Sequence, residues 1–242
     1  MRLDVFLTPY ETAAADIADR TVVVIDVLRA SSTIVEALAS GAKALYPVAE
    51  IEEALRLANT LGREEVLLCG ERRCLPIEGF DLGNSPADFT PERVGGKTLV
   101  MSTTNGTVAM TASTGASRVL IGSWLNLSAV VAELVRSTTE PVILCSGRER
   151  HFGLEDAVCA GLLVRGVMEA LPEIHWEPND GARAAVALAE TFADPEELFR
   201  VCAAGQAIVA AGLADDLAFC AQTDRHEVVP VLQDRQITAS ES

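Results

Sequence analysis

The sequence has little lysine, little histidine and few aromatic residues. Of its 19 basic residues only Lys43 and Lys97 are lysines, and the 242-residue chain holds 3 histidines. Its 35 acidic residues give a formal net charge of −16. Nucleic acids and anionic membranes are bound by clusters of basic residues, so this charge argues against both as partners. Because nearly all basic residues in this acidic chain are arginines, the positions of those arginines are informative.

The sequence also lacks paired cysteines and long hydrophobic runs. Its 6 cysteines include no Cys-x-x-Cys pair. We therefore expect free thiols in a reducing cytoplasm, with neither a disulfide framework nor a zinc site. No apolar run approaches the roughly 18 to 20 residues that a membrane span needs. Residues 1–16 meet acids early and hold no long apolar stretch, so we expect no signal peptide and a cytoplasmic location.

What the sequence does have is a repeated unit of apolar strand, polar loop and helix. The clearest strands are predicted at residues 21–26, 98–102 and 141–145, each followed by a polar loop and a helical pattern. Strands that alternate with helices predict a three-layer α/β/α fold with a mixed, largely parallel sheet. In such sheets ligands bind beyond the carboxyl ends of the strands, so we expect these polar loops to meet at one edge.

The organisation along the chain is simple. We expect one domain over residues 1–242, or two closely packed subdomains that divide near residues 95–96, where two glycines form a turn. A late strand at residues 227–232 contains Pro230, which has no backbone N–H to give to a sheet. Proline therefore predicts an edge position for that strand.

The loop after the first strand carries a carboxylate, a guanidinium and hydroxyls. Asp26 ends the apolar run, Arg29 follows, and Ser31 and Ser32 precede a helical pattern. A helix N-terminus with a serine cap can bind an anion, and arginine can hold a phosphate with two hydrogen bonds. We predict that Asp26 and Arg29 are catalytic and that the serines bind substrate. Asp26 could instead only form a salt bridge with Arg29, and one serine could only cap the helix.

A second polar loop, Ser-Thr-Thr-Asn-Gly-Thr at residues 102–107, is rich in hydroxyls. Asn-Gly favours a tight turn with positive φ, and the amides of such a turn can hold a tetrahedral anion. An ordinary turn with a threonine cap is the alternative. The predicted substrate-binding residues of this loop are Thr103, Thr104, Asn105, Gly106 and Thr107.

A third polar segment covers residues 69–86 and has little helical periodicity. Long polar loops inside a domain are often functional, and carboxylates suit a hard divalent cation. We predict Glu71 and Asp81 as metal ligands. Arg72, Asn84 and Ser85 are predicted to bind substrate. A solvated surface loop is the alternative.

A fourth polar segment covers residues 146–161. We predict that Arg148 binds substrate and that Glu155 and Asp156 bind the metal. These two acids could also form only the first turn of a helix, where negative charge is favourable. His151 could be a general acid or a surface residue.

Together these segments suit a small, multiply anionic substrate bound with a divalent cation. Phosphoryl transfer requires cationic groups, a metal ion and a positioned nucleophile. The polar loops offer arginines, carboxylates that could bind the metal, and a candidate nucleophile.

Five segments in order carry a resemblance to a known family. They are VVVIDVLRASSTIVEAL, GERRCLPIEGFDLGNSP, STTNGT, CSGRERHFGLEDAVCAG and DLAFCAQTDRHEVVPVL. Over nearly the whole chain the sequence resembles the 2-phosphosulfolactate phosphatases of coenzyme M biosynthesis. The resemblance implies a cytoplasmic, Mg²⁺-dependent, homodimeric α/β/α hydrolase that releases sulfolactate and phosphate from 2-phospho-3-sulfolactate. Arg73 and Cys74 lie where small or variable residues are expected, so no role is predicted for them.

The residues do not support a haloacid-dehalogenase mechanism. A haloacid-dehalogenase mechanism needs a second aspartate two positions after the first, and Leu28 stands there. A threonine-nucleophile amidohydrolase leaves the arginines unexplained. A phosphatase for another small phosphorylated hydroxy acid and a non-catalytic anion-binding relative both remain as alternatives. The attacking group, water activated by Mg²⁺ or Asp26 itself, is also left open by the sequence.

Overall fold

The computed structural model describes residues 1–240 and contains an 11-stranded sheet. Its order is β5-β4-β6-β3-β11-β10-β7-β2-β8-β1-β9. The strands are β1 (Arg2–Phe6), β2 (Thr21–Ile25), β3 (Ala44–Pro47), β4 (Val66–Arg72), β5 (Leu75–Pro76), β6 (Thr98–Ser102), β7 (Arg118–Gly122), β8 (Pro141–Cys145), β9 (Glu177–Pro178), β10 (Pro230–Gln233) and β11 (Gln236–Ala239).

The helices lie mostly between these strands in the sequence. They are α1 (Ala14–Ile17), α2 (Ala30–Ala39), α3 (Ile51–Leu61), α4 (Pro91–Val94), α5 (Gly106–Ala112), α6 (Leu127–Arg136), α7 (Leu154–Ala170), α8 (Asp180–Thr191), α9 (Pro195–Val201), α10 (Ala203–Ala210) and α11 (Asp215–Cys220). Residues 1–240 also contain the short 3-10 helices η1 (Pro9–Glu11), η2 (Pro86–Asp88) and η3 (Trp124–Asn126).

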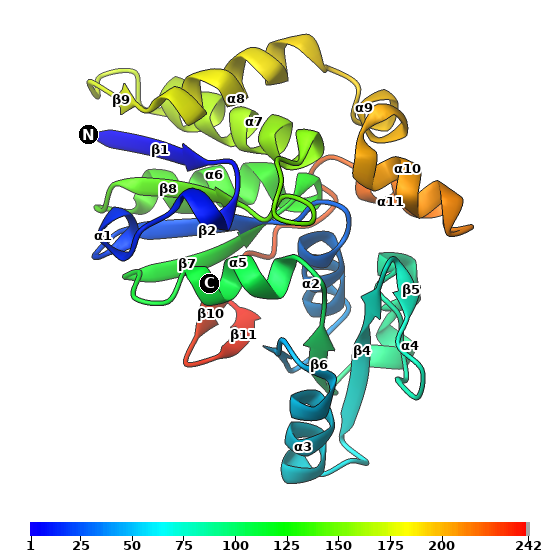
Figure 1. Ribbon diagram of the computed structural model, residues 1–242. Helices are drawn as coiled ribbons and strands as arrows, with labels where there is room; N and C mark the ends of the chain where they lie inside the picture. Colours follow the sequence, from blue (N-terminus) through cyan, green and yellow to red (C-terminus); the bar gives the residue numbers. More distant parts are fainter. Residues whose placement is uncertain (241–242) are drawn as a thin grey trace.

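Strand β2 lies in the interior of the sheet and explains the apolar run that ends at Asp26. It pairs in parallel with β7 on one side and with β8 on the other, and all five of its residues are buried. A strand that is covered on both faces reads as a continuous run of β-branched residues, as this one does. The polar residues that follow it therefore emerge from a rigid strand at its carboxyl end (Figure 1).

Helices cover both faces of the sheet, which confirms the predicted three-layer α/β/α fold. Val23 and Ile25 of β2 pack in a core with α6, α7 and α8, whereas Val22 and Val24 pack on the other face with α1, α2 and α5. A smaller core joins α3 to β4 and β6. The alternation of β2 side chains between two cores follows from the period of two in a strand.

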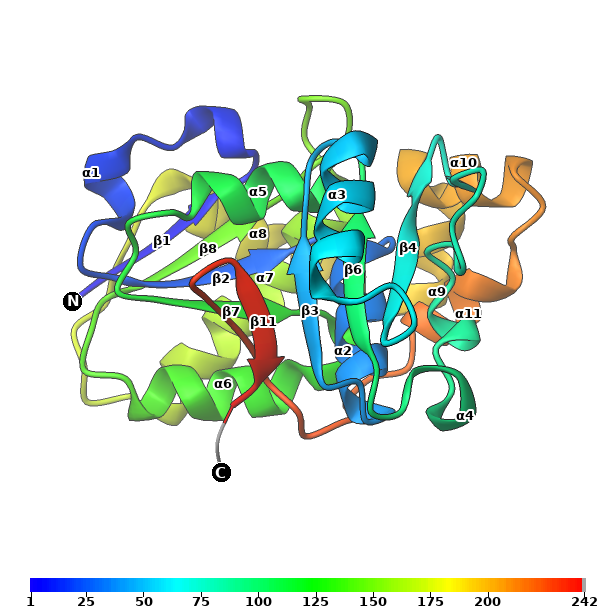
Figure 2. The ribbon, with the colours of Figure 1, turned by 90° about the horizontal axis from the view of Figure 1, so that it is seen from below.

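The sheet is mixed because its C-terminal hairpin runs against its neighbours. Most pairs are parallel, but β10 pairs antiparallel with β7 and β11 pairs antiparallel with β3. Figure 2 shows β11 between β3 and β7. The edge position predicted for the strand containing Pro230 is therefore wrong. Pro230 is the first residue of β10, where its missing N–H is tolerated in an interior strand.

The turn at Gly95 and Gly96 lies between α4 and β6, and Gly96 has a φ of 71°. Strand β6 pairs with β3 and β4 from the part of the chain before this turn. A division into subdomains near residues 95–96 stays a prediction.

Candidate functional site

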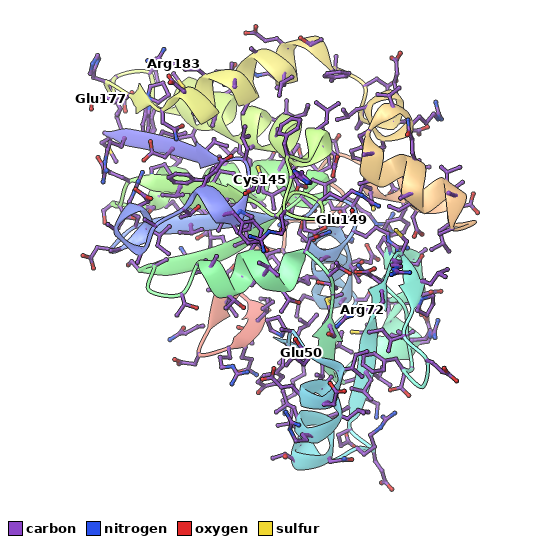
Figure 3. The ribbon with its side chains drawn as sticks, in the orientation of Figure 1. Glu50, Arg72, Cys145, Glu149, Glu177 and Arg183 are labelled. Carbon is purple, nitrogen blue, oxygen red and sulfur yellow. The ribbon has the colours of Figure 1, made fainter. Side chains whose placement is uncertain are left out.

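A small pocket opens at the carboxyl ends of β2, β4, β6 and β8. This is the edge where the sequence placed the polar loops, and Figure 3 labels Glu149 there, near the start of α2. The residues that line it are Asp26, Leu28, Arg29, Glu71, Arg73, Cys74, Asn84, Thr103, Thr104, Asn105, Arg148 and Glu149.

Asp26 is buried and is held by the first turn of α2. Its Oδ1 accepts a hydrogen bond from the Ala30 N–H at 3.2 Å, and its own N–H donates to Ser31 Oγ at 2.8 Å. Ser32 Oγ donates to the Val27 carbonyl at 2.8 Å. Both serine hydroxyls thus engage the backbone of the loop, and neither side chain lines the pocket. The structure does not bring the predicted substrate-binding serines to the site.

The pKa of Asp26 is raised to about 7, chiefly by burial, and the nearby charges of Glu71 and Glu155 contribute to this rise. The Ala30 N–H and the Arg29 guanidinium act in the opposite direction and lower that pKa. A positive charge that approaches this carboxyl would lower its pKa and favour the ionised form. Asp26 is therefore suited to bind a cation or to act on an electrophile.

Arg29 is also buried, but its ion pair is not with Asp26. Its Nη1 lies 2.6 Å from Asp216 Oδ2, and its Nη2 donates to the Cys74 carbonyl at 2.7 Å. The salt bridge between Asp26 and Arg29 that the sequence left open is not formed among residues 1–240. Asp216 was missed because its partner lies 187 residues away in the chain, and no local pattern connects the two.

The Glu71 carboxylate links two segments that line the pocket. Its Oε2 accepts from the Cys74 N–H at 2.8 Å, and its Oε1 accepts from the Thr104 N–H at 2.9 Å. The predicted polar loop begins as a continuation of β4 to Arg72 and turns back into β5. Glu71 therefore joins the tip of that hairpin to the loop after β6.

Arg73 and Cys74 form the tip of this hairpin and line the pocket. Their φ values of 53° and 69° are those of a tight hairpin turn. The Arg73 side chain is exposed and pairs with no acid within residues 1–240. Sequence reasoning gave no role to either residue, yet Arg73 is a free cation at the mouth of the pocket.

The hydroxyl-rich loop contributes three of its predicted residues to the pocket, namely Thr103, Thr104 and Asn105. The predicted Asn-Gly turn is wrong, because Gly106 begins helix α5 and does not have a positive φ. Close packing explains this glycine instead. A Cβ there would lie 2.7 Å from the Ala30 Cβ and 2.9 Å from Asp26 Oδ2. Thr107 is buried behind the loop, 3.2 Å from Thr103 Oγ1.

The two acids at the start of α7 do not line the pocket, and Asp156 holds two loops in place. Asp156 Oδ1 accepts from the Val27 N–H at 2.9 Å, and its Oδ2 accepts from the Gly147 N–H at 3.0 Å. Burial raises the pKa of Asp156, and the charges of Glu155 and Asp26 raise it further. Burial also raises the pKa of Glu155. Their predicted role as metal ligands stays a prediction. Of the site residues predicted in that segment, Arg148 lines the pocket, and its neighbour Glu149, for which no role was predicted, lines it too.

The remaining predicted residues are divided. Asn84 lines the pocket, and its buried Oδ1 has no hydrogen-bond donor within residues 1–240. Ser85 donates to Asp216 and does not line the pocket. Arg72 donates to Ser102 Oγ at 2.9 Å, and Figure 3 labels it on the β4 side of the molecule. Asp81 forms an ion pair with Arg63, with 2.9 Å between the Asp81 Oδ2 and Arg63 Nη2 atoms, and does not line the pocket.

The pocket offers a few oxygen ligands for a hard cation. Within residues 1–240 no three acid, histidine or cysteine side chains converge as a metal cage. Asp26, Glu71 and the unpartnered Asn84 Oδ1 do line one pocket. Mg²⁺ commonly takes one or two carboxylates, substrate phosphate oxygens and water. The donor set fits Mg²⁺ bound in this manner, together with a phosphorylated substrate.

A larger groove of about 1120 Å³ lies elsewhere and is bordered by Thr21 and Arg118, the first residues of β2 and β7. Arg118 pairs with Glu133, and Arg235 of the same groove pairs with Glu53. Each arginine of this groove thus has an acidic partner, and Arg118 and Arg136 share Glu133. We assign the site to the smaller pocket because its cations and carboxylates meet at the carboxyl edge of the sheet.

Comparison with known proteins gives a consistent result. A family model described as 2-phosphosulpholactate phosphatase matches residues 6–235. A probable 2-phosphosulfolactate phosphatase of Thermus thermophilus is 41% identical over 238 residues, which cover 97% of this chain and 96% of that protein. A protein of the same name from Symbiobacterium thermophilum is 40% identical, and the match covers 94% of this chain and 97% of that protein. Another from Caldanaerobacter subterraneus is 37% identical, and the match covers 98% of this chain and 99% of that protein.

The fold, the pocket and these matches define the class as phosphoric monoester hydrolases. The chain belongs to the 2-phosphosulfolactate phosphatase family, as the five sequence segments predicted. Within residues 1–240 no helix has both the length and the apolar character to cross a membrane.

Proposed function

We propose that this protein is a Mg²⁺-dependent phosphatase that hydrolyses 2-phospho-3-sulfolactate to 3-sulfolactate and phosphate. One observation carries the proposal. A buried carboxyl with a pKa of about 7, Asp26, lines the same pocket as an unpartnered amide oxygen and three arginines. Membership of the family supports the identity of the substrate.

The arginines match the charges of this substrate. It carries a phosphate, a sulfonate and a carboxylate, and Arg29, Arg73 and Arg148 all line the pocket. Arg29 is buried and fixed, Arg148 contacts Glu149 at 3.5 Å, and Arg73 is exposed and unpaired within residues 1–240. Guanidinium groups bind phosphate and sulfonate through charge-assisted hydrogen bonds. The fixed Arg29, beside Asp26, is assigned to the phosphate.

The metal-binding residues in this proposal are Asp26, Glu71 and Asn84. When bound, Mg²⁺ would neutralise charge on the phosphate oxygens as the P–O bond breaks. Glu71 already accepts two backbone N–H groups, so its position is rigid. Among the described residues Asn84 Oδ1 has no donor, so binding a cation would satisfy a buried polar atom that is otherwise costly.

Asp26 has one of two tasks in the chemical step. In one route it accepts a proton from a water that attacks phosphorus, the bond between phosphorus and the sulfolactate oxygen breaks, and that oxygen takes up a proton from solvent. In the other, its carboxylate attacks phosphorus, the same bond breaks, and water then hydrolyses the acyl phosphate. Both routes consume one water and release phosphate. An acid-stable, hydroxylamine-sensitive phosphoenzyme would assign the second route.

The test is phosphate release by purified protein from 2-phospho-3-sulfolactate and from other phosphorylated hydroxy acids. We expect the sulfonated substrate to be preferred and activity to disappear in EDTA and return with Mg²⁺. Full activity in metal-free buffer would remove Mg²⁺ from the proposal. Binding of phosphate without release from any substrate would instead indicate a non-catalytic relative.

Three further parts of the proposal rest on the resemblance described above. They are a place in coenzyme M biosynthesis, a cytoplasmic location and a homodimeric state. The dimer is tested by light scattering after size-exclusion chromatography, and the location by fractionation of the host cell. A monomer at micromolar concentration would contradict the proposed homodimer.

A further inference from the structure

Arg29 is fixed in the pocket by a residue from the far end of the chain. Its Nη1 lies 2.6 Å from Asp216 Oδ2, and its Nη2 donates to the Cys74 carbonyl at 2.7 Å. The side chains of Arg29 and Asp216 are only 2% and 5% exposed. The other guanidinium N–H groups have no partner within residues 1–240, and Arg29 lines the pocket.

Asp216 is itself held in place. Its Oδ1 accepts a hydrogen bond from Ser85 Oγ at 2.5 Å, so both carboxylate oxygens are engaged. Helix α11, which carries Asp216, packs against η2 directly after Ser85. Figure 1 and Figure 2 both show α11 beside the β4–β5 hairpin. The carboxylate therefore has one orientation, set by two segments on either side of it.

We propose that Asp216 is a positioning residue that orients the Arg29 guanidinium so that its free N–H groups point at the substrate phosphate. Arginine has a long flexible stem, and a cation that must be ordered during the reaction contributes less than one already in place. The buried ion pair with Asp216 and the bond to the Cys74 carbonyl supply that order beforehand. The inference rests on the proposed phosphatase function, in which Arg29 binds the phosphate.

The first experiment compares Asp216→Asn with Asp215→Asn. Asparagine keeps the shape of the side chain, because its oxygen can accept from Arg29 while its amide donates to Ser85 Oγ. Asp215 is the neighbouring residue on the same helix but is exposed, which makes it the matched control. We expect Asp216→Asn to lower kcat/KM about tenfold or more at equal folded fraction, mainly through kcat, and Asp215→Asn to stay within about twofold.

A double-mutant cycle separates positioning from a merely structural role. If Asp216 acts through Arg29, then Asp216→Asn should cost less than about threefold in an Arg29→Lys background. An equal tenfold loss in both backgrounds, or no loss in the wild-type background, would overturn the inference. Ser85→Ala is a milder second variant for the case that Asp216→Asn does not fold. It should lower activity in the wild-type background and not in the Arg29→Lys background.

A binding measurement keeps this inference apart from the proposed function. Calorimetry with inorganic phosphate needs no turnover, and the same cycle is measured on the dissociation constant. Coupling between Arg29 and Asp216 in phosphate binding, with no hydrolysis of 2-phospho-3-sulfolactate, would support the inference and contradict the proposed function. Additive effects, or no phosphate binding by the wild-type protein, would contradict the inference.

Discussion

Asp26 Oδ1 and the Ala30 N–H are joined by a hydrogen bond of 3.2 Å that places a buried carboxyl at the first turn of α2. Strand β2 fixes the backbone on one side of Asp26, and the helix fixes its side chain on the other. The carboxyl is thus held rigidly at the ligand-binding edge of the sheet, which is the geometry that a reacting group requires.

The raised pKa of Asp26 predicts an unusual dependence of stability on pH in metal-free protein. Its pKa is about 7 in the folded state, against 3.8 for an ordinary aspartate, so between these values the folded state binds more protons. The protonated Asp26 therefore contributes to the free energy of unfolding; this contribution is complete below pH 4 and is lost as pH rises toward 7. At 1.36 kcal/mol per pKa unit the loss is at most about 4 kcal/mol.

Urea unfolding of wild type and Asp26→Asn at pH 5 and pH 8, without metal, measures this effect. We expect the variant to be more stable than wild type at pH 8 and the difference to shrink at pH 5. Addition of Mg²⁺ should stabilise the wild type at pH 8 and leave the variant nearly unchanged, since a bound cation favours the charged carboxylate. Identical curves for the two proteins at both pH values would contradict the buried, unpaired state of Asp26.

Arg29→Lys should reduce turnover far more than Arg136→Lys. Arg29 is buried in the pocket wall, whereas the Arg136 side chain is 72% exposed and pairs with Glu133 on α6. An ammonium cannot reproduce two directed guanidinium bonds, so a loss of roughly 2 to 3 kcal/mol, or about 30- to 150-fold in rate, is expected. Steady-state kinetics at equal folded fraction provide the comparison. Equal effects of the two substitutions would refute the assignment of Arg29.

Gly106→Ala should damage both stability and activity. The added methyl would lie 2.7 Å from the Ala30 Cβ and 2.9 Å from Asp26 Oδ2, so α2 or the carboxylate must shift. Overpacking of this kind costs about 1 to 3 kcal/mol, and a displacement of about 1 Å at a reacting group can cost about 100-fold in rate. Thermal unfolding and kcat measure the two effects. Val108→Ala, on the same helix but 37% exposed, is the control and should keep near-normal activity.

The fold was predictable because its signals are local. The apolar run of β2 and the alternation of strands with helices follow from burial of the sheet on both faces. The position of Asp26 at the carboxyl edge followed from the same run. Pro230 misled the prediction, since proline is also tolerated at the first residue of an interior strand.

The site was only partly predictable because its contacts join distant segments. Ser31 and Ser32 read as anion-binding hydroxyls, but the sequence does not reveal that the loop backbone engages both. The Asn105–Gly106 pair read as a turn, although close approach to Ala30 accounts for the glycine. The partnership of Arg29 with Asp216 leaves no periodic or spacing signal, because it exists only in the folded chain.

The turnover number of Asp26→Asn at saturating Mg²⁺ and 2-phospho-3-sulfolactate tests the central claim most directly. Asparagine keeps the shape of the side chain and one acceptor oxygen, so circular dichroism should show an intact fold. If Asp26 belongs to the reacting centre, turnover falls at least about a thousandfold, roughly 4 kcal/mol. A folded variant that retains about a tenth of wild-type turnover would contradict the account and reduce Asp26 to a structural residue.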